Sequence, residues 1–345
     1  MRIYLDPLLD DRWRDLVASH PRSSVFHQHG WIKALALTYG YRPTVLTSAA
    51  PGKALSDGIV FCEVQSWITG KRLVSLPFAD HVEPLLEDGA DTTALADWMR
   101  AQCEQEGWKY VEIRPLSWIA QPGSSLTASE SFWLHTLSLE PSTERLFSVL
   151  HKSCIQRRIR RAEHERLSYE KGRSAELISE FYRLLMITRR RHRLPPQPRS
   201  WFQNLVDCMS PNVEIRLARK DGKAVAAILT LSHRNSVVYK YGCSDERFHH
   251  LGTMPFLFWK LIEESKAAGF EQVDFGRTDL DNQGLIEFKD RLGATRRQIT
   301  YLRYEKSPRK HGVVATYLPS MRHVFSVLPD PLSSLAGRVL YRHIG

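Results

Sequence analysis

The sequence predicts a mixed α/β protein with two similarly built domains, each a mixed, mostly antiparallel sheet flanked by helices. Three observations lead to this prediction. The length of 345 residues exceeds the usual size of one hydrophobic core. Runs with the spacing of amphipathic helices alternate with short apolar runs typical of strands. A short pattern at a helix-to-strand junction also recurs 162 residues further along the chain.

The second half of the chain gives the clearer pattern. Ser174 is a suitable N-cap for a helix whose apolar residues recur at three- and four-residue spacing. Residues 213–218 and 224–231 predict a β-hairpin, because Asp221-Gly222 between them favours a tight turn. The other predicted elements are a strand at 236–241, a helix at 254–268 and a strand at 271–275.

The first half repeats part of this order. The predicted helix 92–106 ends at Gly107 and leads into Trp-Lys-Tyr-Val-Glu-Ile, as helix 254–268 ends at Gly269 and leads into Phe-Glu-Gln-Val-Asp-Phe. Further predicted elements are a helix at 31–39 and strands at 42–49, 58–66 and 72–76. The predicted domains are residues 1–145 and 146–305, followed by a basic amphipathic tail, 306–345. A cleft between the domains is the expected place for a substrate.

The charge of the chain favours anionic partners. The net charge is +10, from 48 basic and 38 acidic residues. In the tail, residues 306–345, six Lys or Arg residues stand against one acid, Asp330. Phosphorylated precursors, RNA and an acidic membrane surface all fit such a balance.

Cysteine usage and hydropathy suggest a cytoplasmic protein. The five cysteines lie far apart and show no zinc or redox spacing, so buried thiols and no metal are expected. The first residues lack the apolar core of a signal peptide, and no apolar run is long enough for a membrane-spanning helix.

A strand-to-helix turn at residues 247–254 is a candidate donor site. It reads Arg-Phe-His-His-Leu-Gly-Thr-Met, and it precedes the predicted helix whose N-terminal N–H groups favour anions. The turn resembles the pyrophosphate loop of the GNAT acyltransferase superfamily, with His250 in place of the first glycine. The resemblance implies that His250, Gly252 and Thr253 contact the donor.

Residues 274–293 carry a more specific resemblance. Asp274-Phe-Gly-Arg, Gly284-Leu, Phe288-Lys289 and Gly293 resemble the C-terminal signature of the FemAB-like branch of that superfamily, which includes peptidoglycan bridge-forming enzymes. Three further stretches agree with it: His27 to Leu37, Leu76 to His81, and Leu150 to Ala162. The resemblance covers residues 25 to 300 and implies two tandem GNAT-like domains that transfer acyl or aminoacyl groups.

The resemblance also implies two catalytic residues. Lys289 corresponds to a lysine that stabilises the oxyanion formed when an amine attacks the donor carbonyl. Asp80 corresponds to an acid that takes the proton from the acceptor amine, with His81 as an alternative base. The structural alternatives are an ordinary helix-surface lysine and a turn-forming aspartate.

Several residues are expected to bind substrate. Lys152, Arg157 and Arg161 lie on the basic helix, where they either bind phosphates or form a solvated face. Tyr241 either bonds to substrate or is an ordinary strand residue. The remaining residues predicted to bind substrate are Arg277 and Phe288.

These features favour an N-acyltransferase that passes an acyl group from acyl-CoA to an amine of a cell-envelope saccharide or lipid-linked precursor, as in exopolysaccharide or peptidoglycan synthesis. One alternative is an aminoacyl-tRNA-dependent transferase of cell-wall precursors. Another is a non-catalytic RNA- or polysaccharide-binding module. The tail either makes a peripheral contact with an anionic membrane, on its inner face, or packs on the first domain. The oligomeric state is left open.

Overall fold

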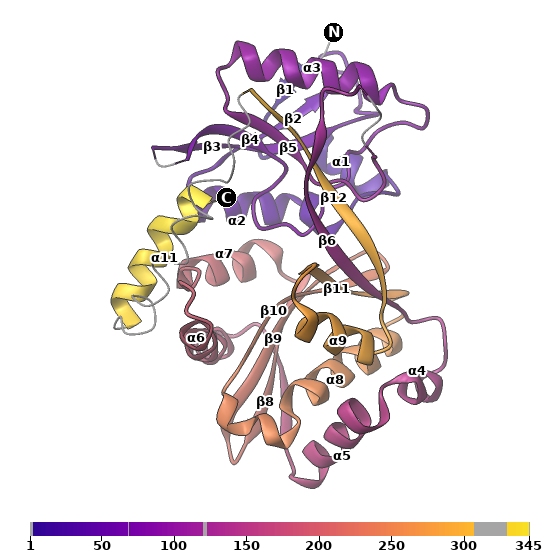
Figure 1. Ribbon diagram of the computed structural model, residues 1–345, viewed down its shortest axis with the longest axis vertical. Helices are drawn as coiled ribbons and strands as arrows, with labels where there is room; N and C mark the ends of the chain where they lie inside the picture. Colours follow the sequence, from indigo (N-terminus) through magenta and orange to yellow (C-terminus); the bar gives the residue numbers. More distant parts are fainter. Residues whose placement is uncertain (1–2, 68, 120–122, 307–329, 345) are drawn as a thin grey trace. The chain divides into compact units, whose positions relative to one another are not determined.

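The structure, a computed structural model, describes all residues except 1–2, 68, 120–122, 307–329 and 345 (Figure 1). Its described residues form two compact units. Unit 1 draws on Met1–Ser131, Ile299–Arg322 and Leu335–Gly345, and unit 2 on Phe132–Gln298 and His323–Ser334. Strands β6 (Thr127–Ser138) and β12 (Thr295–Glu305) each contribute residues to both units. The predicted ranges 1–145, 146–305 and 306–345 stay a prediction about domains.

Unit 1 contains a mostly antiparallel sheet in the order β1-β2-β3-β4-β5-β12, in which only the β4–β5 pair is parallel. Its strands are β1 (Ile3–Leu5), β2 (Arg42–Thr47), β3 (Ile59–Ser66), β4 (Gly70–Val74) and β5 (Tyr110–Ile113). Its helices in the first part of the chain are α1 (Arg12–Ser19), η1 (Val25–His27), α2 (His29–Tyr39) and α3 (Thr92–Gln105).

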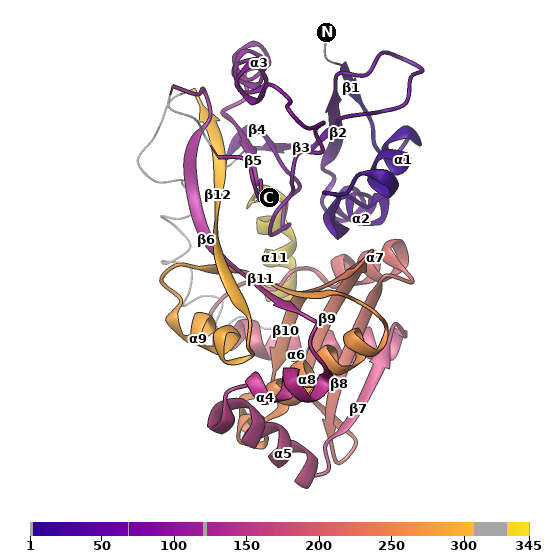
Figure 2. The same ribbon diagram turned by 90° about the vertical axis from the view of Figure 1, so that its right-hand side faces the viewer.

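Helices cover both faces of this sheet. Successive strand residues point to opposite faces, and Leu46 belongs to the core cluster that includes Leu95 and Met99 of α3. Its neighbour Val45 lies on the other face with Trp13 of α1, since a Cβ added at Gly58 would lie 3.2 Å from Val45 and 2.8 Å from Trp13. Figure 2 shows α3 and α1 on opposite sides of β2.

Unit 2 contains a sheet in the order β6-β11-β10-β9-β8-β7. The strands not yet named are β7 (Ser168–Gly172), β8 (Val213–Lys220), β9 (Lys223–His233), β10 (Ser236–Ser244) and β11 (Gln272–Asp279). The helices are α4 (Thr143–Val149), the π-helical turn η2 (Lys152–Gln156), α5 (Arg157–His164), α6 (Ala175–Arg191), α7 (Arg199–Met209), η3 (Glu246–Leu251), α8 (Thr253–Ala267) and α9 (Gln283–Arg291). The predicted β8–β9 hairpin is confirmed, and Asp221 and Gly222 both take positive φ at its turn.

Two helical layers enclose the unit 2 sheet. On one face, Leu257 and Leu261 of α8 pack with Ile159 of α5 in the main core cluster. On the other face, Cys243 of β10 donates to the carbonyl oxygen of Phe181 in α6. Figure 1 shows α6 and α8 on opposite sides of β8 to β10. The mixed α/β class and the flanking helices are as predicted.

The central strands β10 and β11 pair in parallel over a short stretch only. The pairing runs from Ser236 with Gln272 to Val238 with Asp274. Just beyond it, β10 has an irregularity between Tyr239 and Tyr241. On its other side β11 has one too, in its pairing with β6, between Asp274 and Arg277. Beyond this stretch the two strands no longer pair with each other, while β10 stays paired with β9 and β11 with β6.

The C-terminal helix α11 (Asp330–Ile344) packs on unit 1 from Leu335 onward. The carbonyl oxygen of Tyr341 accepts a hydrogen bond from the Tyr41 hydroxyl at 2.6 Å. That of His343 accepts from Thr69 Oγ1 at 2.9 Å and from Arg72 Nη2 at 2.7 Å. Arg72 also places a cation at the C-terminus of α11, where it offsets the helix dipole. Of the two alternatives for the tail, packing on the first domain is thus the one that these contacts show for its C-terminal end. Residues 306–329 of the predicted tail lie, apart from Lys306, outside the described residues.

Candidate functional site

A cavity of about 500 Å³ opens in unit 2 beside the ends of β10 and α8. Its walls come from η2, α5, α6, β10, η3, α8 and α9. One part of the lining is cationic or imidazole-bearing: Arg158, Arg191, His192, His249, Lys289 and Arg291. Another part is apolar: Ile155, Met254, Pro255, Phe258, Leu285 and Phe288. Among the described residues that line the cavity, none is Asp or Glu.

The cationic part centres on His249. Arg191 Nη1 donates to His249 Nε2 at 3.3 Å, and the Ser244 hydroxyl lies 2.8 Å from the same nitrogen. A guanidinium group only donates, so Nε2 carries the lone pair and Nδ1 the proton. Burial, and then the charge of Arg191, lower the pKa of His249. The imidazole is therefore neutral at neutral pH, and the positive charge of this wall comes from its arginines and Lys289.

The three arginines of this wall differ in their partners: Arg291 pairs with Glu287 at 2.7 Å, whereas Arg158 and Arg191 have no acidic partner among the described residues. Arg158 donates to the backbone oxygen of His249 at 3.4 Å. Within the described part of the chain, neither Arg158 nor Arg191 forms an ion pair. Their guanidinium groups are thus available to an anionic ligand.

The aromatic side chains of the apolar wall pack against one another. The ring of Phe258 in α8 lies 4.8 Å from that of Tyr239 and 5.4 Å from that of Phe288, both edge to face. Phe288, a predicted substrate-binding residue, lines the cavity together with Leu285. Edge-to-face packing of this kind fixes the rings in place, so the wall is preformed.

The helix entry beside this wall differs from a simple phosphate loop. Gly252 takes φ of 79°, and an added Cβ would lie 2.2 Å from the carbonyl oxygen of Arg158. Packing against α5 therefore requires this glycine, whatever the ligand. Neither Gly252 nor His250, whose side chain is exposed, lines the cavity.

Thr253, in contrast, does line the cavity. Its Oγ1 is buried and has no hydrogen-bond partner among the described atoms. Its backbone N–H and that of Met254 belong to the first turn of α8, where N–H groups lack partners within the helix. Pro255 has no N–H to satisfy. The helix entry thus offers a hydroxyl and two N–H groups near the arginines.

Lys289 lies at the cavity but is almost fully buried. Its Nζ donates to Gly276 O at 2.9 Å, Arg277 O at 3.2 Å and Thr278 Oγ1 at 2.8 Å. An ammonium group has three donors, and three oxygens of β11 already accept from this one. The structure thus shows a lysine that binds the irregular part of β11, and its part in catalysis stays a prediction.

A buried histidine lies close to Lys289. His135 of β6 has no exposed surface, and its Nε2 lies 3.5 Å from Asp290 Oδ1. Burial, and then the charge of Lys289, lower the pKa of His135 to about 4. It is therefore neutral at neutral pH.

The other predicted substrate-binding residues lie away from the cavity lining. Tyr241 is buried, and its hydroxyl accepts from Trp201 Nε1 at 2.9 Å. Arg277 stacks on the ring of Phe132 at 4.1 Å. The exposed residues Lys152, Arg157 and Arg161 are not in the lining, and Arg161 pairs with Glu165 at 3.3 Å.

Asp80 lies in unit 1, in a loop with an unusual backbone. Phe78 takes φ of 64°, which is rare for a residue with a side chain. Arg114 donates to Ala79 O at 3.2 Å, and the Tyr301 hydroxyl donates to Asp80 O at 2.7 Å. The loop is therefore firmly held, and Asp80 is largely buried. Because Asp80 and Lys289 belong to different units, a shared role for them stays a prediction.

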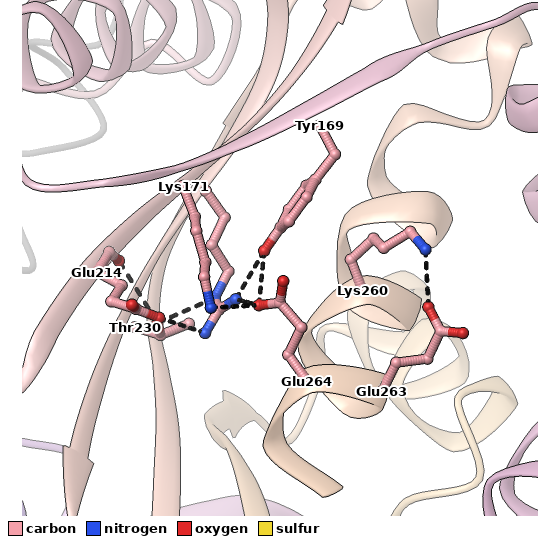
Figure 3. A network of polar contacts seen from close by, with 8 residues as sticks. Tyr169, Lys171, Glu214, Thr230, Lys260, Glu263 and Glu264 are labelled. Carbon is pink, nitrogen blue, oxygen red and sulfur yellow. Dashed lines mark hydrogen bonds and ion pairs between the residues drawn. The ribbon is translucent and has the colours of Figure 1, made fainter. Parts of the chain in front are cut away.

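A second cationic cluster in unit 2 centres on buried Arg216 (Figure 3). Its guanidinium pairs with Glu264 and, at 2.6 Å, with Glu214, and it donates to the Tyr169 hydroxyl at 2.7 Å. Figure 3 shows Tyr169 and Lys171 pointing toward Glu264, with the Lys260–Glu263 pair beside them. This cluster is electrostatically balanced.

Across the described residues, no group of three or more His, Cys, Asp or Glu is placed to hold a metal ion. Every helix in the described parts of the chain is too short or too polar to cross a bilayer.

Comparison with known proteins defines the class. Residues 151–290 match the family model of the acetyltransferase (GNAT) domain, and this range contains the cavity residues from Cys154 to Lys289. The chain thus carries a GNAT domain, and the predicted acyltransferase class is confirmed. No curated protein sequence matches the chain.

Solved structures confirm the two-domain GNAT fold. The crystal structure of FemX is similar with a TM-score of 0.68 and 12% identity, over 88% of this chain and 97% of that one. A tandem GNAT protein from the clavulanic acid biosynthesis pathway gives 0.55 and 13%, over 90% and 99%. The C-terminal domain of a protein described as a lysylphosphatidylglycerol synthetase, from Agrobacterium fabrum, gives 0.55 and 14%, over 91% and 94%. The resemblance to the FemAB-like branch is thus confirmed at the level of the fold.

Proposed function

We propose that the protein is an N-acyltransferase that takes an apolar acyl group from acyl-CoA in the unit 2 cavity and passes it to an amine. The observation that carries this proposal is the composition of the lining: two arginines without an ion pair in the described structure, Arg158 and Arg191, an apolar wall with aromatic rings, and no acid among the described lining residues. The GNAT domain supplies the reaction class, and the lining supports the choice of donor.

The phosphates of the donor are assigned to Arg158, Arg191 and the entry of α8. Arginine binds phosphate through two parallel hydrogen bonds, and a helix N-terminus adds N–H groups and a favourable dipole. Thr253 Oγ1, buried without a partner in the described structure, fits a further contact to the donor.

The acyl group is assigned to the aromatic wall around Phe258 and Phe288. An aminoacyl ester would bring an α-ammonium group into the same cavity. Two like charges about 6 Å apart repel by about 3 kcal/mol at an effective dielectric constant of about 20, and the described lining offers no carboxylate in compensation. The lack of a carboxylate in the described lining therefore favours acyl-CoA over aminoacyl-tRNA as the donor.

In the proposed reaction, the acceptor nitrogen attacks the thioester carbonyl and forms a tetrahedral oxyanion. The C–S bond then breaks, the thiolate leaves and takes up a proton, and the nitrogen loses one to give an amide. The irregularity in β10 between Tyr239 and Tyr241 lies beside the cavity in which the reaction is proposed to occur. Lys289 holds the facing part of β11, and Asp80 is proposed as the proton acceptor.

The proposed acceptor is an amine of a cell-envelope saccharide or of a lipid-linked precursor, such as a peptidoglycan or exopolysaccharide intermediate. This assignment rests on the likeness in fold to FemX and to the protein described as a lysylphosphatidylglycerol synthetase, which is an argument by analogy. It places the reaction in the cytoplasm, at the inner face of the membrane.

A panel of donors tests this proposal by thermal denaturation. We expect octanoyl-CoA to raise the melting temperature more than CoA, because the apolar wall adds to phosphate binding, and ligand binding to the folded state stabilises it by mass action. Aminoacyl-tRNA and uncharged tRNA serve as the competing ligands. Stabilisation by aminoacyl-tRNA and not by acyl-CoA would transfer the assignment to the aminoacyl donor. Equal stabilisation by any RNA, with none by a thioester, would favour a nucleic-acid-binding module.

A further inference from the structure

One surface of unit 1 exposes apolar side chains on a helix that is firmly attached. From Leu335 onward, α11 buries Gly337 and His343 toward unit 1. His343 Nδ1 lies 3.1 Å from Ser66 Oγ, and its carbonyl oxygen accepts from Arg72 and Thr69. These contacts fix which face of the helix points outward.

The outward face is apolar and cationic. Leu335 is 58% exposed and Val339 is 47% exposed. They are four residues apart, so they lie on one side of the helix. Arg338 and Arg342 are exposed as well, and the stretch from Ser334 to His343 contains no acidic residue.

A tryptophan extends this face. Trp67, in the turn between β3 and β4, is 84% exposed. Its ring lies edge to face with that of His343, at 5.5 Å between centroids. Trp67 therefore stands next to the end of α11 and not on a separate part of the unit. A tryptophan of this exposure is costly in water, and its amphipathic ring is favoured at the boundary between lipid headgroups and acyl chains.

We propose that Trp67, Leu335, Arg338, Val339 and Arg342 form a surface that binds an anionic phospholipid membrane. We call it the α11 surface. The apolar side chains enter the boundary between headgroups and acyl chains, and the two arginines contact lipid phosphates. An amphipathic helix with arginines beside its apolar residues binds anionic lipid in this way.

The size of the α11 surface favours a membrane over a protein partner. A stable protein interface needs about 20–30 residues on each side, whereas this surface consists of five. Insertion into a bilayer needs only a few apolar side chains, since the surrounding lipid supplies the contacts. The positive charge of the chain, +10, acts in the same direction.

This inference adds a partner to the proposed function, because a lipid-linked acceptor lies in the same membrane. It does not depend on the donor, since the α11 surface belongs to unit 1 and the donor cavity to unit 2. The two proposals can therefore fail separately.

Vesicle co-sedimentation of the full chain tests it. The vesicles are phosphatidylcholine alone, or phosphatidylcholine with 30% phosphatidylglycerol. The test variant carries Trp67→Ser, Leu335→Ser and Val339→Ser. The control variant carries Leu9→Ser and Ile119→Ser, two residues of unit 1 that are 85% and 75% exposed and lie outside the α11 surface. We expect wild type and control to sediment with the anionic vesicles, the test variant to lose at least fivefold in apparent affinity, and phosphatidylcholine to bind weakly.

Two further measurements keep the result clear. Far-ultraviolet circular dichroism and the melting temperature establish that the test variant is folded, and the stabilisation by octanoyl-CoA reports separately on the cavity. Replacing Arg338 and Arg342 by Gln is expected to reduce binding to anionic vesicles at least threefold. Equal binding of the test variant and the wild type, or equal binding to both kinds of vesicle, would overturn the proposal. So would a wild-type dimer that the test variant abolishes, because the surface would then join two copies of the chain.

Discussion

Two cationic regions of unit 2 differ in one respect, the presence of carboxylates. Around Arg216, every charge has a counterpart: Glu214, Glu264 and the Tyr169 hydroxyl satisfy the guanidinium (Figure 3). Around Arg158 and Arg191, no carboxylate of the described residues forms an ion pair with them. Buried charges must be paired in a stable fold, whereas charges left unpaired beside a cavity are available to a ligand. The first region is thus explained by stability and the second by binding.

Removing a carboxylate from the cluster around Arg216 should give the largest effect on stability. Glu264→Ala leaves the buried Arg216 without one of its two carboxylate partners, so we expect the free energy of unfolding to fall by about 3 kcal/mol. Urea denaturation measures it. Glu263→Ala is the matched control, since it only removes a half-exposed pair with Lys260, which contributes less than about 1 kcal/mol. Similar losses in both variants would mean that the two regions do not differ as described.

Substitutions in the region around Arg158 and Arg191 should weaken donor binding and leave the free energy of unfolding unchanged. We expect Arg158→Gln and Arg191→Gln each to weaken octanoyl-CoA binding about tenfold, because each removes a charge-assisted contact of about 1.5 kcal/mol. Isothermal titration calorimetry measures the affinity. The control, Arg157→Gln, changes an exposed residue of the same helix that does not line the cavity. If the two variants instead bind octanoyl-CoA as tightly as the wild type but have a lower free energy of unfolding, Arg158 and Arg191 serve stability and not binding.

The pH dependence of the free energy of unfolding tests a third feature, the buried and neutral His135. The folded-state pKa of His135, about 4, lies below its ordinary value of 6.5. Its contribution to stability is therefore complete above pH 6.5 and is lost as the pH falls toward 4, because the unfolded chain takes up the proton first. Between pH 7.5 and pH 5 this loss amounts to about 2 kcal/mol. We expect His135→Gln to remove that part of the pH dependence in urea denaturation, while His250→Gln, at an exposed site, leaves it unchanged. Parallel pH profiles for wild type and His135→Gln would refute this account of His135.

A further stability effect of similar size to the arginine effect is expected for Lys289. If its main task is to hold the irregular part of β11, Lys289→Met should lower stability by about 1–2 kcal/mol, since carbonyl oxygens lose their donor. Donor affinity should change less than in Arg158→Gln. Full stability together with a loss of turnover of a hundredfold or more would instead support the oxyanion role.

Local patterns predicted most of the elements around the site. The β8–β9 hairpin, helix α8 and strand β11 follow from turn residues, helix spacing and apolar runs. Strands β6 and β12 were not predicted, because their exposed starts read Thr-Ala-Ser-Glu and Thr-Arg-Arg-Gln, without apolar alternation. Such strands are specified by their neighbours in the sheet and not by their own sequence.

The site was predicted only in part, for reasons that are local to β10 and α5. Thr253, Phe288 and Lys289 line the cavity, and their roles there stay predictions. Tyr239 and Tyr241 would share a face in a regular strand, but the irregularity between them leaves Tyr239 at the cavity and turns Tyr241 toward Trp201.

The sequence also did not show which arginine of α5 lines the cavity. Arg158, three residues after the buried Ile155, lines the cavity, whereas its neighbour Arg157 does not. That spacing was the one available signal. Which arginine lacks an acidic partner depends on the tertiary fold, and the sequence does not contain that information in any local pattern.

A crystal structure with octanoyl-CoA tests the central claim most directly. In that structure we expect the donor phosphates within about 3 Å of the Arg158 and Arg191 guanidinium groups and the octanoyl chain against Phe258 and Phe288. A donor bound elsewhere on the protein, with this cavity empty and both arginines in contact with solvent alone, would contradict it.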